Sequence, residues 1–97
     1  MAVARFTLEV AADHPAFDGH FPGHPVLPGV VLLAEVVAAA ERLLGLPADA
    51  LLIKVAKFHA PVPPGACLEV ELAPGRDIAF AISCGATRVA TGNLAAQ

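Results

Sequence analysis

Residues 29–45 are the segment that most restricts the fold of this chain. They are apolar at nearly every position, and a helix that is hydrophobic on all sides is a buried helix. Gly45 followed by Pro47 is typical of a helix end. In a chain of 97 residues, such a helix is covered only if a sheet curls around it or if a partner subunit packs on it. The charged exceptions within the segment are Glu35, Glu41 and Arg42.

Most of the remaining chain has the alternating apolar and polar pattern of half-buried β-strands. Clusters of proline and glycine separate these stretches and predict rigid turns. Strands are predicted at residues 4–11, 51–59, 67–73, 78–82 and 86–95, and turns at 61–65 and 74–77. One strand, one long helix and then an antiparallel meander predict a single α+β domain that spans residues 1–97.

The composition predicts that the chain does not act alone. Hydrophobic residues make up 57% of it, and the 8 glycines raise the apolar share to about 65%, against about 45–50% on average. A domain of this size has little interior, so this apolar surface should be covered by another copy. We therefore expect a homodimer or a trimer of dimers.

Charge and cysteine content exclude several classes of function. The net charge is -3 and the basic residues are scattered, so we expect no nucleic-acid binding. Cys67 and Cys84 are too few for a disulfide scaffold, and we expect buried free thiols in a reducing cytoplasm. The first ten residues do not resemble a signal peptide, and no apolar run is long enough to span a membrane.

The segment before the helix, residues 17–28, contains two histidines between turn-forming residues. Each of its three prolines fixes φ near about -65° and restricts the residue before it, so the loop is stiff. Gly29 then begins the helix, where backbone N–H groups are free and the helix dipole is positive. A histidine that faces such amides is a plausible place for chemistry on a carbonyl compound. The alternative for Gly29 is a glycine that only allows the Pro-Gly corner to form.

These residues resemble a known family. His20-Phe21-Pro22-Gly23, followed by residues 25–30 (PVLPGV), is similar to the active-site segment of 3-hydroxyacyl-(acyl-carrier-protein) dehydratases, above all their short version from aryl-polyene lipid synthesis. The resemblance continues, in order, through Lys57-Phe58, Pro64-Gly65 and Thr91-Gly92. It implies a hot-dog fold, in which a curved antiparallel sheet of about five strands wraps around one long helix.

The resemblance also implies a reaction and a site. The expected activity is the dehydration of 3-hydroxyacyl thioesters on acyl carrier protein, without a cofactor or a metal. His20 would remove the α proton, the N–H of Gly29 would bind the thioester oxygen, and Glu35 would assist at the hydroxyl group. The expected lining of the acyl tunnel is Phe21, Leu27 and Val30.

Glu35 departs from the family pattern. The family's acid comes fourteen positions after the histidine, which here is Ala34, and one helical step turns a side chain by about 100°. Either the segment is re-registered so that Glu35 still reaches the cavity, or Glu35 is structural, on one helix face with Ala39 and Arg42 and paired with Arg42. The second case favours a degenerate subunit that binds acyl chains or pairs with an active dehydratase, and a thioesterase is a further alternative.

The other histidines carry weaker predictions. His24 lies in the same loop and could flank the pocket. His14 and His59 are predicted to be ordinary surface or strand-edge residues. No pair of His, Cys, Asp or Glu residues has the spacing typical of a metal site.

Overall fold

The computed structural model describes residues 3–11 and 29–96. The predicted helix and all five predicted strands are present, and their ends agree with the predictions to within a few residues. A short 3-10 helix, which was not predicted, precedes the second strand. The elements are β1 (Ala4–Glu9), α1 (Gly29–Leu44), η2 (Ala48–Ala50), β2 (Leu51–Phe58), β3 (Cys67–Pro74), β4 (Ile78–Cys84) and β5 (Thr87–Ala96).

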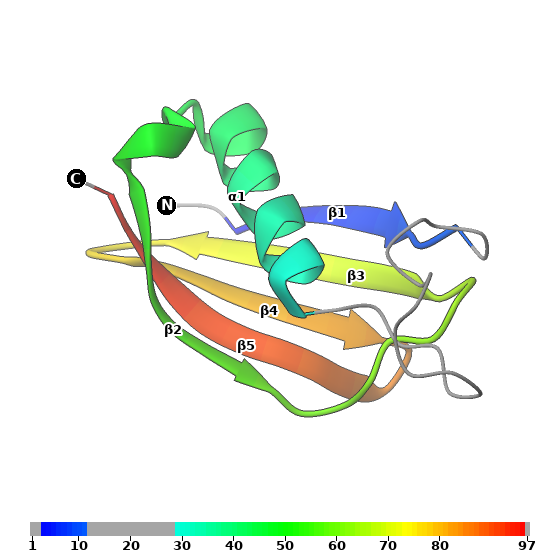
Figure 1. The fold of residues 1–97 in the computed structure, drawn as a ribbon. Helices are drawn as coiled ribbons and strands as arrows, with labels where there is room; N and C mark the ends of the chain where they lie inside the picture. Colours follow the sequence, from blue (N-terminus) through cyan, green and yellow to red (C-terminus); the bar gives the residue numbers. More distant parts are fainter. Residues whose placement is uncertain (1–2, 12–28, 97) are drawn as a thin grey trace.

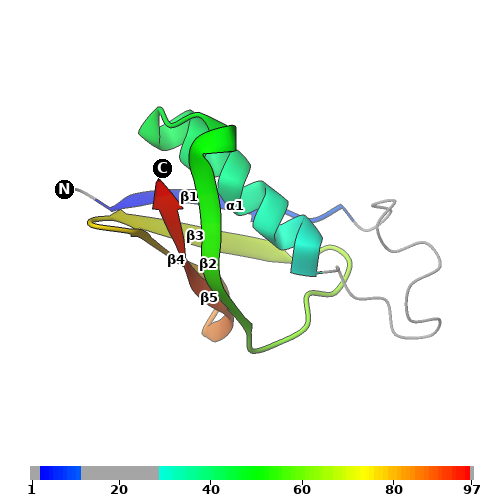
Figure 2. The same cartoon turned by 60° about the vertical axis from the view of Figure 1, so that its left-hand side comes forward.

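The strands form one curved antiparallel sheet, and α1 lies across one of its faces (Figure 1). The strand order is β1-β3-β4-β5-β2, so β1 and β2 are the two edges of the sheet. The connection between them, which contains α1, crosses from one edge to the other. Seen from the side in Figure 2, the described residues form two layers, one of helix and one of sheet. This α+β arrangement confirms the predicted hot-dog fold.

The core lies between α1 and the sheet. Alternate residues of the strands face the helix, as the period of two in a β-strand requires. They meet a narrow stripe on α1, whose members recur at intervals of three and four residues and are fully buried. The stripe consists of Leu32, Val36, Ala39 and Ala40, and the largest buried side chains of the sheet are Leu68, Leu72, Ile82 and Leu94.

The helix is not buried on all sides within one chain. The sheet covers the stripe, whereas Ala34 and Ala38 are exposed and the side chain of Val30 is 72% exposed. The curved sheet therefore covers only one side of the helix, and the other side is open to a partner subunit. None of the helices in the described part of the chain has the length and apolar character needed to cross a membrane.

The prediction of two buried thiols is wrong. Both cysteines are free, but Cys67 is exposed and Cys84 is half-buried. Cys67 begins β3 and is followed by the buried Leu68, so the alternation of the strand turns the thiol to the outer face of the sheet.

Gly92 marks the point where β5 passes closest to its neighbours. A methyl group added to Gly92 would overlap the carbonyl oxygen of Val55 and lie 2.5 Å from Cε2 and Cζ of Phe80. The pairing of β2 with β5 shifts by one residue between Ile53 and Val55, which indicates a β-bulge at this level. A glycine is therefore required here by close backbone approach.

We predict that Gly92→Ala destabilises the protein by at least about 2 kcal/mol, because the added methyl group must displace both a strand carbonyl and a buried ring. Urea unfolding at fixed protein concentration measures this loss. Gly75→Ala is the matched control, since its methyl group would lie at an ordinary 3.5 Å from the Asp77 carbonyl oxygen. Equal effects of the two substitutions would contradict the steric explanation.

Candidate active site

Three of the predicted site residues can be placed in the structure. Gly29 is the first residue of α1, Val30 follows it, and Glu35 lies in the second turn. The other three lie outside the described residues and keep their roles as predictions: His20, Phe21 and Leu27.

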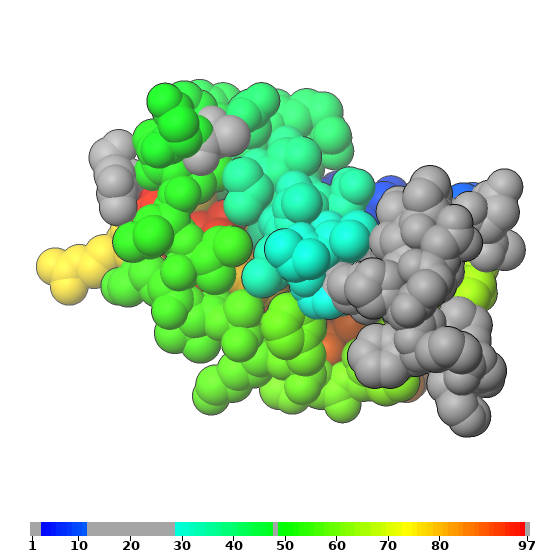
Figure 3. Space-filling view, in the orientation of Figure 1, coloured from blue at the N-terminus to red at the C-terminus, as the bar shows by residue number. Residues whose placement is uncertain are grey.

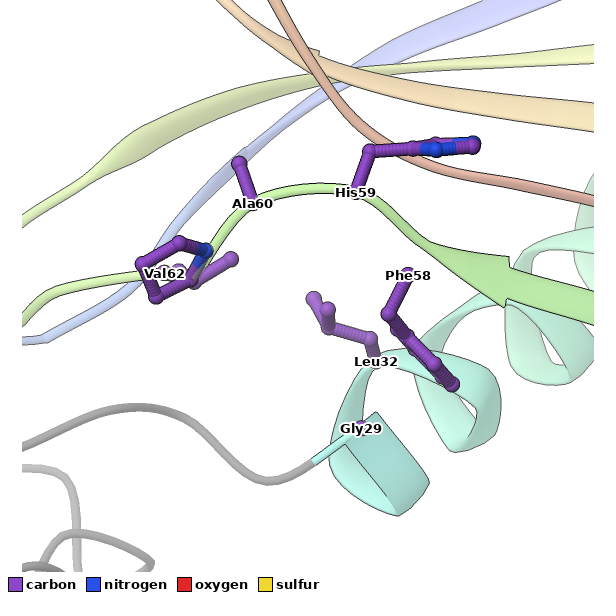
Figure 4. A pocket seen from close by; sticks show the side chains of 7 residues that line it. Gly29, Leu32, Phe58, His59, Ala60 and Val62 are labelled. Atoms are coloured by element: carbon purple, nitrogen blue, oxygen red, sulfur yellow. The ribbon is translucent and has the colours of Figure 1, made fainter.

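A hollow of about 440 Å³ opens beside the first residue of α1. Figure 4 shows the side chains of Leu32 and Phe58 next to Gly29, and the chain that leaves β2 on the opposite side. As the first residue of the helix, Gly29 has an N–H group without an intrahelical acceptor. The lining is mostly apolar and consists, among the described residues, of Gly29, Leu32, Phe58, His59, Ala60, Pro61 and Val62.

The ring of Phe58 rests on Gly29. A methyl group at Gly29 would lie 2.7 Å from Cζ and 2.9 Å from Cε1 of Phe58. The glycines with positive φ in the described residues are Gly45, Gly65 and Gly85, so Gly29 does not need its conformational freedom. A side chain at position 29 would also displace the outer end of the Phe58 ring, which is a steric reason for glycine here besides the expected Pro-Gly corner.

Glu35 lies on a different side of α1 from the groove-facing residue Ala34. Arg42, seven positions later and thus on the same side as Glu35, has its guanidinium carbon 5.7 Å from the centre of the Phe6 ring in β1. The helix is regular from Gly29 to Leu44, so it contains no irregularity that would turn Glu35 to the side on which Ala34 lies. Glu35 is half-buried and is not among the described residues that line the hollow beside Gly29.

The suggested pairing of Glu35 with Arg42 is not present. Between residues that the structure describes, the ion pairs join Arg5 to Glu71 and Lys54 to Asp77, whereas Arg42 lies over Phe6. The three positions that were predicted to share a face do share it, since Ala39 lies between Glu35 and Arg42 on the buried edge of that side.

A second hollow, the helix groove, runs along the uncovered face of α1. It has a volume of about 460 Å³ and lies between the helix and β2, which are neighbours on one face of the molecule (Figure 3). Val30, which was expected to line the acyl tunnel, faces this groove and is not among the described residues that line the hollow beside Gly29. The groove is lined by Val30, Leu33, Ala34, Val37, Ala38, Glu41 and Ile53.

His59 is exposed, as predicted, but it also lies at the edge of the hollow. Its ring points away from Phe58, toward β5, where Nε2 lies 3.0 Å from the Thr91 hydroxyl oxygen (Figure 4). Sequence reasoning missed this pairing. The signal that could have found it is the pair of later motifs, because Lys57-Phe58 directly precedes His59 and Thr91-Gly92 contains Thr91.

Comparison with known families identifies a match over nearly the whole chain. Residues 2–93 match the family model called ApeI-like, described as ApeI dehydratase. The chain is 39% identical over 88 residues to the 3-hydroxyacyl-(acyl-carrier-protein) dehydratase FabZ of Thermus thermophilus, an alignment that covers 82% of this chain and 60% of the relative. The FabZ of Myxococcus xanthus is 40% identical over 73 residues, which cover 65% of this chain and 47% of the relative. The chain thus spans about half to three fifths of the length of these relatives.

Solved structures share the fold. A chain of the dehydratase heterocomplex ApeI:P from Xenorhabdus doucetiae superposes with a TM-score of 0.81 and 25% identity, covering 96% of this chain and 85% of that one. The R-hydratase PhaJ1 of Pseudomonas aeruginosa has a TM-score of 0.65 and 19% identity over 98% of this chain and 79% of that one, which supports the fold alone.

We predict that the contact between Phe58 and Gly29 appears as a coupling energy in a double-mutant cycle. Gly29→Ala should cost about 1 kcal/mol in the wild-type background, because the methyl group meets the outer end of the half-exposed Phe58 ring, which must turn aside. With Phe58→Ala in place the same change should cost less than about 0.5 kcal/mol, since the ring is gone. Urea unfolding of the four proteins measures the cycle, and additive effects would show that the ring does not restrict position 29.

Proposed function

The chain belongs to the ApeI-like dehydratase family, and on this basis we propose that it dehydrates 3-hydroxyacyl thioesters carried by acyl carrier protein. The observation that carries the proposal is the hollow beside Gly29, where the first backbone amide of α1 adjoins an apolar lining. The amide can donate a hydrogen bond to a thioester oxygen, and the apolar lining can hold an acyl chain. We propose one domain for this work, and the cytoplasm as its location, in keeping with the low cysteine content.

In the proposed reaction His20 removes the proton from the carbon next to the thioester carbonyl. Negative charge develops on the thioester oxygen, and the N–H of Gly29 stabilises it together with the positive end of the helix dipole. The carbon–hydroxyl bond then breaks, the hydroxyl receives a proton and leaves as water, and a double bond remains. The thioester itself makes the α proton acidic, so the proposal needs no cofactor or metal. Phe21 and Leu27 are proposed to line the acyl site.

Glu35 is proposed to give the proton to the departing hydroxyl. Because Glu35 is not part of the described lining beside Gly29 of its own chain, this role needs the carboxylate of a second subunit, whose contact would have to reach beyond the helix groove to the side of α1 that Glu35 occupies. The position that the family pattern favours, Ala34, faces the helix groove and offers no proton.

The proposed partner for the uncovered face is a second copy of the chain. The edge strand β2 exposes the apolar side chains of Leu52, Ile53, Val55 and Phe58 beside Lys54 and Lys57, whereas the other edge, β1, exposes the polar side chains of Arg5, Thr7 and Glu9. Exposed backbone groups on an apolar edge favour strand pairing, and charged side chains oppose it. Pairing β2 with its copy around a two-fold axis would also cover the helix groove. A homodimer, or a trimer of dimers, follows.

The acyl carrier protein is acidic, so we propose that it binds near exposed basic residues. Two of the candidates are already paired, because Arg5 lies 2.6 Å from Glu71 and Lys54 lies 2.9 Å from Asp77. Lys57 is exposed and, unlike these two, has no ion-pair partner among the residues that the structure describes. It lies opposite Thr91 on the outer face of β2, one position before Phe58, and is the candidate contact for the carrier protein.

We predict that the chain hydrates a medium-chain enoyl thioester, the reverse of the dehydration, and that His20→Ala lowers kcat/KM by at least about 100-fold because no base remains. Glu35→Gln should lower it comparably if its carboxyl group supplies the proton. Ultraviolet absorbance of the enoyl thioester follows the reaction with both pantetheine and carrier-protein substrates.

Matched controls separate a catalytic loss from a folding loss. His14→Ala changes a histidine outside the motif, and Glu69→Gln changes an exposed carboxylate on the outer face of the sheet, so both should keep full activity. Full activity of Glu35→Gln would remove Glu35 from the mechanism. Release of free acid by the wild type, instead of hydration, would replace the dehydratase by a thioesterase.

We predict that Ala38→Arg converts the dimer into a monomer, because it places a charge in the helix groove without touching the core of one chain. Light scattering at micromolar concentration measures the mass, and far-ultraviolet circular dichroism checks the fold. Ala86→Arg, in an exposed turn, is the control and should stay dimeric. A monomeric wild type would contradict the homodimer and direct the search to a different partner chain, since the similar ApeI:P is a heterocomplex.

A further inference from the structure

Phe58 has an unusual environment for a phenylalanine at the end of a strand. Its side chain is 50% exposed, although aromatic side chains contribute most when they are buried. It lies on the helix-facing side of β2, because its partner in β5, Ala90, is buried in the core. The ring therefore points into the space in front of the sheet instead of away from the molecule, and its outer end rests on Gly29.

The ring lies where the two hollows of the molecule approach each other. Gly29 lines the hollow at the start of α1, and the next residue, Val30, lines the helix groove. On β2 the same division is found, since Phe58 borders the first hollow and Ile53 borders the groove. The side chain that stands between Gly29 and the strand at this boundary is Phe58 (Figure 4).

We infer that Phe58 is a specificity-determining residue that limits the length of the bound acyl chain. The inference rests on the proposed function, in which the thioester oxygen binds at the Gly29 amide. With the ring in place, an acyl chain that starts there is confined to the hollow of about 440 Å³. Removal of the ring takes away the side chain between Gly29 and β2, and we expect the hollow then to open toward the helix groove, whose volume is about 460 Å³. The apolar lining of the groove, with five apolar side chains on α1 and Ile53 on β2, suits the methylene groups of a longer chain.

The test measures binding without requiring turnover. Isothermal titration calorimetry with butyryl-pantetheine and dodecanoyl-pantetheine, both saturated and unreactive toward dehydration, gives Kd for a short and a long chain. In Phe58→Ala the ratio of the dodecanoyl Kd to the butyryl Kd should fall by about tenfold or more relative to the full-length wild type. Phe58→Leu, which keeps an apolar side chain of smaller reach, should give a smaller change in the same direction and guards against misfolding of the alanine variant.

Val55→Ala is the matched control. Val55 belongs to the same strand and its side chain is 44% exposed, but it lies opposite Asn93 on the outer face of the sheet, away from both hollows. Its Kd ratio should equal that of the wild type.

Each other outcome overturns the inference. An unchanged ratio in both Phe58 variants shows that the ring does not limit chain length. Equal weakening of both ligands shows a structural role only, and a wild type that binds neither ligand shows that no acyl site exists beside Gly29. The enoyl hydration assay separates the inference from the proposed function. If the Kd ratio changes in the Phe58 variants but the wild type does not hydrate enoyl thioesters, the acyl site is supported and the dehydratase activity is rejected. If the wild type hydrates enoyl thioesters but the Kd ratio is unchanged, only the role of Phe58 is rejected.

Discussion

The packing of one apolar stripe of α1 against the curved sheet determines the rest of the structure. Four buried positions of the helix, from Leu32 to Ala40, meet the inward-facing residues of the strands. This contact fixes the rotation of the helix, and so decides which residues face β1, which face the helix groove and which face the hollow at the helix start. A small domain has only this single core with which to offset the conformational entropy lost on folding. The apolar residues that remain outside the stripe are therefore available for binding.

The fold was largely predictable because it follows from periodicity. The alternation in residues 67–73 and the continuous apolar helix each allow few solutions in a short chain, and both were found where they were expected. The exposure of Cys67 was missed because composition favours buried cysteines, whereas position in the strand decides the direction of the side chain. The bulge in β2 could not be predicted, since it arises where Gly92 and Val55 approach each other across the sheet.

The site was predictable in part. The position of the helix start at Gly29 followed from a proline-glycine pair before an apolar run, and the turn of about 100° per residue correctly indicated that Glu35 and Ala34 face different sides. The contact between Phe58 and Gly29 was not predictable, because it joins a strand end to a helix start that the sequence separates widely. Contacts of this kind depend on tertiary structure alone. Residues 12–28 lie outside the described part of the chain, so the position of His20 stays a prediction.

The contact between the ring and the glycine has a consequence for the evolution of this chain. A larger residue at position 29 displaces the outer end of the Phe58 ring, whereas a smaller residue at position 58 displaces nothing while position 29 remains glycine. The two substitutions are therefore easier in one order, with position 58 changed before the glycine. Descendants of an ancestor with this pair could explore different side chains at the mouth of the hollow, and thereby different substrates, without disturbing the backbone amide on which the chemistry is proposed to depend.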